Sequence, residues 1–338
     1  MNCPILTEFF STTKKVVTER PVLSKKPDDK FETTLFLPAC ASRQGEGGLR
    51  KKGLFKNNDA DYPLVTVITI VFNGAEHLEE TILSVLNQTY DNVEYILVDG
   101  GSLDGTLDII RKYEHAIDYW VSEKDAGIYD AMNKGIGLAT GEWINFMNAG
   151  DLFYENKTID MVVHKSESDL GVALIYGDIE RVSDRYMYLA NVKKALSPVT
   201  IEDFVMKMPI CHQSMFFRLW SFKLMGLYNI RYKICADHDW LIKLILNGYR
   251  LKYLSVCIAS YNMDGVSSSS IFRRERERLD IALMHFNAGL KLKVYFRASI
   301  SFVKSPITFC LSKLNLLGAH RRLKQMRASI NSKRAPGS

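Results

Sequence analysis

The strongest constraint on the fold is a regular alternation of two hydrophobic patterns between Leu64 and Met147. Short β-branched apolar runs, typical of strands buried on both faces, alternate with segments whose apolar residues recur at helical spacing. Such an alternation predicts α/β architecture, with βαβ units on a mostly parallel sheet flanked by helices. The predicted strands are Leu64–Phe72, Val93–Val98, Ile117–Val121 and Glu142–Met147, and a predicted helix follows each of the first three.

The flanking regions follow the pattern less closely. Residues 1–60 are polar and rich in lysine and glycine, so we expect an N-terminal extension of loop or partly ordered structure. After residue 151 the alternation loosens, although several apolar runs remain. We expect strands at Ala173–Tyr176, Ser214–Phe217 and Leu251–Tyr261, and a helix at Trp240–Leu246.

Composition and charge exclude several protein classes. Hydrophobic residues make up 47% of the chain, which is enough for a sizeable core. No apolar signal region or membrane-spanning run is visible, and the six cysteines contain no CxxC pair, so we expect a cytoplasmic protein with reduced thiols. The net charge of +6 is uneven, because residues 281–338 hold 11 Lys/Arg and no Asp or Glu.

Polar residues stand where the predicted strands end. Asn73, Asp99 and Asp151 follow the first, second and fourth strands of the series. In open α/β sheets, ligands bind in the crevice beyond the carboxyl ends of the strands. We therefore expect a ligand site at this edge of the sheet.

The segment Asp99–Thr106 has the sequence DGGSLDGT and joins a strand to a helix. An acidic residue at a strand end can accept hydrogen bonds from a ribose or a base, and the paired glycines let a ligand approach the backbone closely. The alternative is a tight turn in which Asp104 caps the next helix. The chain lacks both GxGxxG after its first strand and GxxxxGK[ST], which argues against dinucleotide-binding and P-loop enzymes.

The segment Asn148–Asp151 follows the fourth strand and has small residues between its polar ends. A carboxylate in such a place can hold Mg²⁺ or Mn²⁺ together with a diphosphate, since Mg²⁺ takes few protein carboxylates. The alternative is a turn with Asp151 as a helix cap.

Two later segments carry further candidates. Asp237 and Asp239 open an apolar helix, where one carboxylate can accept a proton from an attacking hydroxyl while the other orients it. Plain N-capping is the competing interpretation. His212 and Gln213 offer donors to phosphate or sugar hydroxyls, although spacing alone slightly favours a structural role for His212.

Taken in order, these motifs resemble the family 2 glycosyltransferases of the GT-A fold over about Leu64–Ser268. Asp99–Thr106 resembles the family's DGxSxDGT, Met208–Gln213 its MPxxHQ, and Asn148–Asp151 its DxD element. Asp125–Gly135, with the sequence DAGIYDAMNKG, resembles a segment of a bacterial branch that builds surface polysaccharides. The resemblance implies a GT-A catalytic domain at 61–268, with a nucleotide-binding half (61–151) and an acceptor half (152–268).

The resemblance also implies roles for individual residues. Asp237, with Asp239 as the alternative, would be the catalytic base of an inverting transfer. Asp151 would hold the divalent cation, Mg²⁺ or Mn²⁺, and UDP is the expected nucleotide. His212 and Gln213 would serve the acceptor or the diphosphate. The donor would be bound by Asn73, Asp99, Gly100, Ser102, Asp125, Lys134 and Asn148.

The chain departs from the family pattern at two places. Asn148 and Gly150 stand where many relatives have acids, which leaves Asp151 as the one carboxylate of that element. Ala236 stands where many relatives have Glu before the catalytic Asp. We therefore expect a cation held largely by the diphosphate, and the choice between Asp237 and Asp239 stays open.

The basic region 269–338 is predicted to be helical and amphipathic. Lys293, Arg297 and Lys304 fall on one helical face beside apolar residues, and Pro306 would end that helix. We expect peripheral attachment to the inner face of the cell membrane, near a lipid-linked or saccharide acceptor. The alternative is a helix pair packed on the catalytic domain. The motifs give no support for a nucleic-acid partner.

The expected function is assembly of a bacterial surface polysaccharide, namely capsule, exopolysaccharide or O-antigen. A nucleotidyltransferase with a similar sheet is one alternative, but Asn73-Gly74-Ala75 does not form the Gly-rich phosphate loop it would need. A protein that binds a nucleotide-sugar without catalysis is the other alternative.

Overall fold

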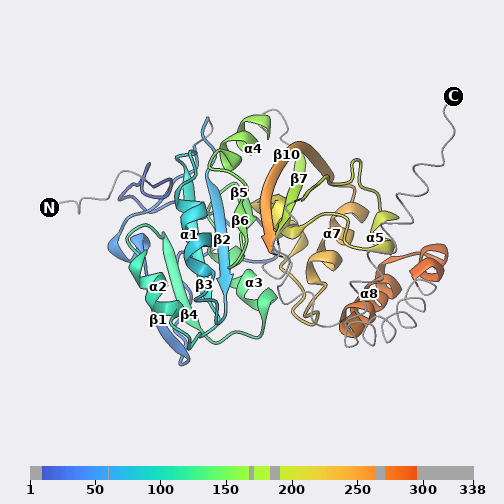
Figure 1. The fold of residues 1–338 in the computed structure, drawn as a ribbon, viewed down its shortest axis with the longest axis horizontal. Helices are drawn as coiled ribbons and strands as arrows, with labels where there is room; N and C mark the ends of the chain where they lie inside the picture. The colour runs from blue at the N-terminus through green and yellow to red at the C-terminus, as the bar shows by residue number, and fades with distance from the viewer. Residues whose placement is uncertain (1–9, 60, 167–170, 183–190, 263–270, 295–338) are drawn as a thin grey trace, which may run out of the picture. The chain divides into compact units, whose positions relative to one another are not determined.

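The structure is a computed structural model, and it describes residues 10–59, 61–166, 171–182, 191–262 and 271–294. The chain divides into two compact units, Met1–Ser269 and Ser270–Ser338. Within the described residues, the first unit is built on one ten-stranded sheet (Figure 1). The strand order is β1-β4-β3-β2-β5-β9-β7-β10-β6, with β8 paired to β7.

The strands are short except for two in the second half of the unit. They are β1 Arg43–Gly47, β2 Val65–Val71, β3 Val93–Asp99, β4 Tyr119–Glu123, β5 Trp143–Phe146, β6 Leu152–Phe153, β7 Val172–Val182, β8 Asn191–Lys193, β9 Met215–Arg218 and β10 Arg250–Asn262.

Helices occupy the connections between the strands. They are α1 Leu78–Leu86, α2 Thr106–Lys112, α3 Ile128–Leu138, α4 Thr158–Ser166, α5 Asp203–Met206, α6 Leu219–Met225 and α7 Ala236–Leu246 in the first unit, and α8 Ile271–His285 in the second. Two 3₁₀ helices, η1 Leu49–Lys52 and η2 His212–Ser214, lie in the first unit, and residues 288–294 of the second unit are also helical.

The sheet confirms the predicted mostly parallel α/β architecture. All seven residues of β2 and all seven of β3 are buried, as expected for strands covered on both faces. β2 pairs in parallel with both β3 and β5, and its pairing places Val71 opposite Asp99. The carboxyl ends of these strands are therefore level, so the loops that follow them lie at the same edge of the sheet.

The strand β9 runs against its neighbours. It pairs antiparallel with β5 on one side and with β7 on the other. Because β9 points the opposite way, the segment that precedes it, including η2, lies at the edge where β5 ends. This reversal brings His212 and Gln213 to the edge that carries the loops after β2, β3 and β5.

The N-terminal segment contributes a strand that the sequence analysis did not expect. β1 pairs antiparallel with β4 at the edge of the sheet. Leu49 and Arg50 continue the contact through backbone hydrogen bonds to the carbonyl oxygens of Ile117 and Asp118, at 2.9 and 2.8 Å. The sequence RQGEG has no apolar alternation, so its strand conformation follows from pairing with β4 rather than from a local pattern.

A buried ion pair fixes the same segment to the sheet. Arg50 Nη2 lies 2.6 Å from Glu94 Oε1, and both side chains are almost wholly buried. Glu94 also accepts hydrogen bonds from Thr66 and Thr140. A buried pair of this kind is costly to break, because removing one partner leaves the other charge unpaired.

In the second unit, the described residues contain the helix α8, over Ile271–His285. The predicted basic face begins at Lys293, after the end of α8. Arg297, Lys304, Pro306 and the remainder of the basic tail lie outside the described residues. Within the part of the chain that the structure describes, no helix is long and apolar enough to cross a membrane.

Candidate active site

The loops after β2 and β3 are joined by hydrogen bonds. The backbone N–H of Asn73 donates to Ser102 Oγ at 2.7 Å, and the N–H of Leu103 donates to Asn73 Oδ1 at 3.0 Å. Asn73 has a φ of 49°, in the left-handed region that asparagine tolerates better than most residues. The polar ends of two neighbouring strands therefore form one connected rim, as the sequence predicted.

Asp99 lies beneath this rim with a full set of donors. It is 0% exposed, and it accepts hydrogen bonds from Gly101 N (3.2 Å), Ser102 N (3.0 Å), Ser122 Oγ (2.6 Å) and Ser102 Oγ. The carboxylate thus shapes the loop 99–106 from below. Its predicted direct contact with the nucleotide stays a prediction.

Asp125 lies against the same loop, and its carboxylate leaves no room for a side chain at Gly100. A Cβ atom on Gly100 would fall 2.5 Å from Asp125 Oδ2 and 3.3 Å from the Phe72 ring. Phe72, Gly100 and Asp125 are therefore neighbours at the surface of the rim. Phe72 is 65% exposed, and the sequence analysis did not select it. The sequence feature that could have identified Phe72 is an aromatic residue placed directly between the end of a buried strand and Asn73.

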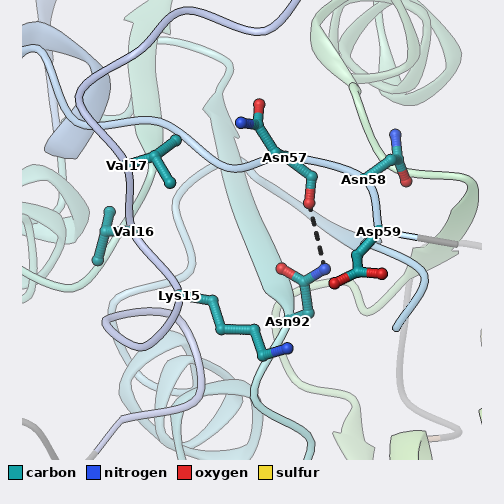
Figure 2. A pocket seen from close by; sticks show the side chains of 7 residues that line it. All are labelled: Lys15, Val16, Val17, Asn57, Asn58, Asp59 and Asn92. Atoms are coloured by element: carbon teal, nitrogen blue, oxygen red, sulfur yellow. Dashed lines mark hydrogen bonds between the residues drawn. The ribbon is translucent and has the colours of Figure 1, made fainter. Parts of the chain in front are cut away.

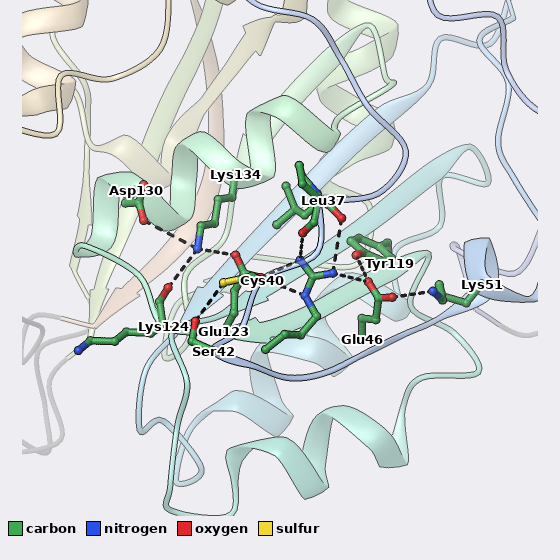
Figure 3. Close-up of polar contacts among 12 residues, drawn as sticks. Leu37, Cys40, Ser42, Glu46, Lys51, Tyr119, Glu123, Lys124, Asp130 and Lys134 are labelled. Atoms are coloured by element: carbon green, nitrogen blue, oxygen red, sulfur yellow. Dashed lines mark hydrogen bonds and ion pairs between the residues drawn. The ribbon is translucent and has the colours of Figure 1, made fainter.

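Lys134 is part of a charged network at the edge of the rim, shown in Figure 3. Its Nζ lies 2.8 Å from Glu123 Oε1 and 3.8 Å from Asp130 Oδ2. Arg43 of β1 binds the other oxygen of Glu123 through Nε and Nη2, at 3.0 and 2.8 Å. Burial alone would raise the pKa of Glu123, but the hydrogen bonds from Lys134 and Arg43 outweigh it and hold the pKa low. Lys134 is thus already paired with Glu123.

Asp151 faces the site from the loop after β5. Gln213 Nε2 donates to its Oδ2 at 2.7 Å, and the backbone N–H of Asn262 donates to its Oδ1 at 3.0 Å. Burial raises the pKa of Asp151 to about 7. The structure therefore brings together Asp151 and Gln213, two predicted residues 62 positions apart.

The loop after β5 also holds an oxygen without a partner. Asn148 Oδ1 is buried and accepts no hydrogen bond from the residues that the structure describes. The described part of the chain contains no cluster of three or more His, Cys, Asp or Glu suited to a metal ion. Oxygen atoms of Asn148 and Asp151 nevertheless fit a hard cation such as Mg²⁺ or Mn²⁺, provided that a diphosphate and water complete its coordination.

The acceptor-side residues lie among aromatic rings. His212 Nε2 is 2.9 Å from Tyr228 Oη, and its ring packs against Phe146 and Phe217. Burial lowers the pKa of His212, and the nearby Asp237 carboxylate opposes that shift. A neutral His212 suits hydrogen bonding to a substrate rather than charge neutralisation.

Asp237 and Asp239 have different surroundings. Asp237 is partly exposed, and Tyr129 Oη donates to its Oδ1 at 2.8 Å. Asp239 is 1% exposed and forms a 2.6 Å ion pair with Lys243, one turn along α7. The structure thus distinguishes the two carboxylates between which the choice was open: Asp237 is partly exposed, and Asp239 is buried in an ion pair.

A chain of contacts links the two sides of the site. Asp151 binds Gln213, which is next to His212, and His212 binds Tyr228. The Tyr228 ring lies 5.5 Å from the ring of Tyr129, which binds Asp237. Predicted residues from both halves therefore lie along one edge of the sheet.

A cavity with no predicted residue lies near the other end of the strands. It has a volume of about 490 Å³ and is lined by residues that include Lys15, Asp59 and Asn92 (Figure 2). Asn92 directly precedes β3, whereas Asp99 ends it, so this cavity is at the edge opposite the candidate site. Because ligands of such sheets bind beyond the carboxyl ends of the strands, this cavity is not where the sequence analysis expects the substrate.

Comparison with known proteins identifies the class. Residues 66–226 match the model of glycosyl transferase family 2. The chain is 34% identical over 238 residues to a PGL/p-HBAD biosynthesis glycosyltransferase of Mycobacterium bovis, covering 69% of this chain and 89% of the relative. It is also 32% identical over 186 residues to an uncharacterized glycosyltransferase of Mycobacterium tuberculosis, covering 54% of this chain and 70% of the relative. The chain therefore belongs to glycosyltransferase family 2.

Solved structures share the fold. The mannosyltransferase PcManGT of Pyrobaculum calidifontis, in complex with GDP-Man and Mn²⁺, is similar with a TM-score of 0.54 and 20% identity, over 81% of this chain and 86% of that one. TarS of S. aureus, in complex with UDP-GlcNAc, is similar with a TM-score of 0.54 and 18% identity, over 65% of each chain. The predicted GT-A-type fold is thereby confirmed, and the protein is a glycosyltransferase with a nucleotide-sugar-binding fold.

Proposed function

We propose that this glycosyltransferase moves one sugar, with inversion, from a nucleotide-sugar to a lipid-linked or saccharide acceptor of a bacterial surface polysaccharide. UDP is the expected nucleotide. The observation that carries the proposal is the common edge of the sheet, where the rim at Asn73 follows β2, Asp151 follows β5, and a path of contacts runs from Asp151 to Asp237.

The donor binds along the rim after β2, β3 and β4. Phe72 offers an exposed apolar face to a base, and Asp125 offers a carboxylate beside the close backbone approach at Gly100. Asp99 and Ser102 keep the loop in shape from below. Lys134 borders the donor while it is paired with Glu123.

Asp151 and Asn148 would hold the divalent cation. When bound, Mg²⁺ or Mn²⁺ neutralises the charge that develops on the leaving diphosphate. Gln213 orients the Asp151 carboxylate through their 2.7 Å hydrogen bond. Support for a cation comes from the donor set itself and from PcManGT, whose complex contains Mn²⁺.

Asp237 accepts the proton of the attacking hydroxyl. Both hydrogen bonds that it receives from the described residues, from Tyr129 Oη and His238 N, go to Oδ1. Oδ2 is thus the oxygen that meets the acceptor. General-base catalysis of this kind contributes about 10²–10⁴-fold to a rate.

A donor screen tests the proposal. Release of nucleotide diphosphate is measured with UDP-, GDP- and dTDP-sugars in the presence of Mn²⁺, then after chelation with EDTA. We expect turnover with one nucleotide class, its loss with EDTA, and its loss in Asp151→Ala. Unchanged turnover of Asp151→Ala, or binding of a nucleotide-sugar without turnover of any of the three classes, would count against a transferase that works through this carboxylate.

The basic C-terminal region suggests attachment to the inner face of the cell membrane. Residues 281–338 carry 11 Lys/Arg and no acid, and each such residue near an anionic leaflet contributes about 1 kcal/mol. Flotation with anionic liposomes should carry the full chain upward at low salt and release it at high salt. Failure to float at low salt contradicts the attachment.

A further inference from the structure

The segment Asp125–Gly135 connects the two sides of the site. Asn133 of α3 forms two hydrogen bonds with the backbone of Tyr228, one from its Nδ2 to the carbonyl oxygen and one from the Tyr228 N–H to its Oδ1, both 2.9 Å. Lys233 donates to the carbonyl oxygen of Ala126 at 2.9 Å. The segment that carries the donor-side Asp125 therefore also holds the loop that leads into Asp237.

Tyr129 is the member of this segment that contacts a reacting group. Its ring is buried at 7% exposure, and its hydroxyl lies 2.8 Å from Asp237 Oδ1 and 2.8 Å from the carbonyl oxygen of Ile234. A phenol has one proton to donate, so the two acceptors compete for it. An ionised carboxylate is the stronger acceptor, because charge-assisted hydrogen bonds are roughly twice as strong as neutral ones.

We propose that Tyr129 is a positioning residue that stabilises the ionised, proton-accepting form of Asp237 and aims its Oδ2 at the acceptor hydroxyl. While Asp237 is ionised, the Tyr129 proton is directed to Oδ1. When the acceptor proton has moved to Oδ2, the carboxyl is neutral and the Tyr129 proton can turn to the Ile234 carbonyl. No proton passes through Tyr129, and the transferred proton rests on Asp237.

The other side chains around Asp237 do not replace this role, and the one backbone donor to Oδ1 that the described residues supply, the N–H of His238 at 2.9 Å, is unaffected by a change at Tyr129. His212 and Tyr228 face it from η2 and from the loop before α7, and they are bonded to each other at 2.9 Å. On its own helix, Asp239 is paired with Lys243. Burial and the Asp237 carboxylate raise the pKa of Tyr129, so its hydroxyl keeps its proton and remains a donor throughout the working pH range.

This inference rests on the proposed role of Asp237 as the base and extends it to a residue on the donor side. It also gives the motif DAGIYDAMNKG a physical purpose. The same short helix that begins beside the donor carboxylate Asp125 sets the orientation of the base, so the two substrates meet a single rigid element.

The test compares Tyr129→Phe with Tyr113→Phe. Both substitutions remove one hydroxyl that donates to a carboxylate, but Tyr113 binds Glu79, at 2.7 Å, in the α1–α2 region. The assay is nucleotide release from the active nucleotide-sugar, starting with UDP-GlcNAc and GDP-Man, over a range of pH.

For Tyr129→Phe we expect kcat to fall about tenfold or more, and the acidic limb of the pH–rate profile to move up by about one pH unit. The KM for the donor should stay within about twofold, because no donor contact is removed. Tyr113→Phe should leave both kcat and the acidic limb unchanged. A Tyr129→Phe enzyme with full activity and an unmoved acidic limb overturns the inference.

Two further measurements separate the possible failures. Asp237→Asn tests the proposed function. If this variant retains turnover, Asp237 is not the base, regardless of the result for Tyr129→Phe. If Tyr129→Phe does not fold, 3,5-difluorotyrosine at position 129 supplies a more acidic donor, and the acidic limb should then move to lower pH. An unmoved limb in that variant also overturns the inference.

Discussion

The donor side and the acceptor side of this site are built in different ways. On the donor side, the loops after β2 and β3 are held by backbone N–H groups and short polar side chains, with Asp99 at their centre. On the acceptor side, Asp237 and His212 are held by tyrosine hydroxyls within a cluster of aromatic rings.

Under the proposed function, this difference matches each side of the site to a task. Loops held rigid by backbone hydrogen bonds suit a polar nucleotide-sugar, which must be held in one place without much rearrangement of the protein. An aromatic surround lowers the local dielectric, which strengthens each hydrogen bond to a charged group and makes the protonation of a carboxylate sensitive to single contacts. Substitutions on the donor side should therefore act on binding and stability, and those on the acceptor side on the chemical step.

The comparison is tested most strongly by Asp237→Asn. We expect transfer to fall by about 10²–10⁴-fold, because the amide cannot accept the acceptor proton, while nucleotide binding stays intact. The matched variant Asp239→Asn should instead lower stability, since it leaves Lys243 without its ion-pair partner. Initial rates and calorimetric binding of the nucleotide diphosphate measure the first effect, and thermal unfolding measures the second. Equal rate losses in the two variants would contradict the division of roles.

Asp99→Asn tests the donor side. The amide can keep its oxygen where Oδ2 accepts from Gly101 N and Ser102 N, but its N–H₂ then replaces the Oδ1 acceptor of the Ser102 hydroxyl, so the buried hydrogen-bond set loses that bond and its charge. We expect the free energy of unfolding to drop by about 2–4 kcal/mol and nucleotide affinity to weaken by about tenfold. Urea denaturation and calorimetry provide the two measurements. The control is Asp104→Asn, an exposed loop residue whose loss should cost no more than about 1 kcal/mol.

Asp118 gives the donor half a dependence of stability on pH. Burial raises its pKa from 3.8 to about 7 in the folded protein, although the Lys56 ammonium opposes the shift. The folded state therefore binds this proton more tightly than the unfolded state. Its contribution is full below pH 3.8 and is lost as the pH rises to about 7.

Asp118→Asn should remove that dependence. The amide oxygen can still accept the hydrogen bond from the Tyr95 N–H, so we expect stability at pH 8 to rise by about 1–3 kcal/mol and the slope between pH 4 and pH 7 to flatten. Chemical denaturation at several pH values is the measurement. An unchanged slope would show that Asp118 is not the group that titrates.

Lys134→Met is expected to have the smallest effect. Because Lys134 is already paired with Glu123, its loss should weaken donor binding by about two- to fivefold, through a less ordered end of β4. A loss above about a hundredfold in affinity for the nucleotide diphosphate would show direct contact with the phosphates. That outcome would place a charged contact on the donor side and blur the contrast between the two sides.

Local pattern was sufficient to predict most of the donor side. The strands β2 and β3 are continuous apolar runs, and Asn73 and Asp99 follow them directly, so their meeting at one edge could be inferred from parallel pairing. The helix α3, Ile128–Leu138, follows the third predicted strand as expected. The strand β1 escaped prediction, because its conformation depends on pairing with β4, about 75 residues away in the sequence.

The acceptor side shows the limit of local pattern. The sequence left the choice between Asp237 and Asp239 open, and Tyr129 was an unassigned aromatic residue in another motif. Their roles depend on contacts between segments about 100 residues apart, such as the 2.8 Å bond from Tyr129 to Asp237.

The order of buried strands, the polar residues at their ends and the family were determined by the amino-acid sequence, because strand periodicity and strand-end chemistry are local properties of the chain. Which of the two carboxylates is partly exposed, which one is buried in an ion pair, and which tyrosine binds the exposed one were decided by the tertiary structure. The physical reason is that charge and proton affinity depend on the groups within a few ångströms in space, and folding draws those groups from distant parts of the chain.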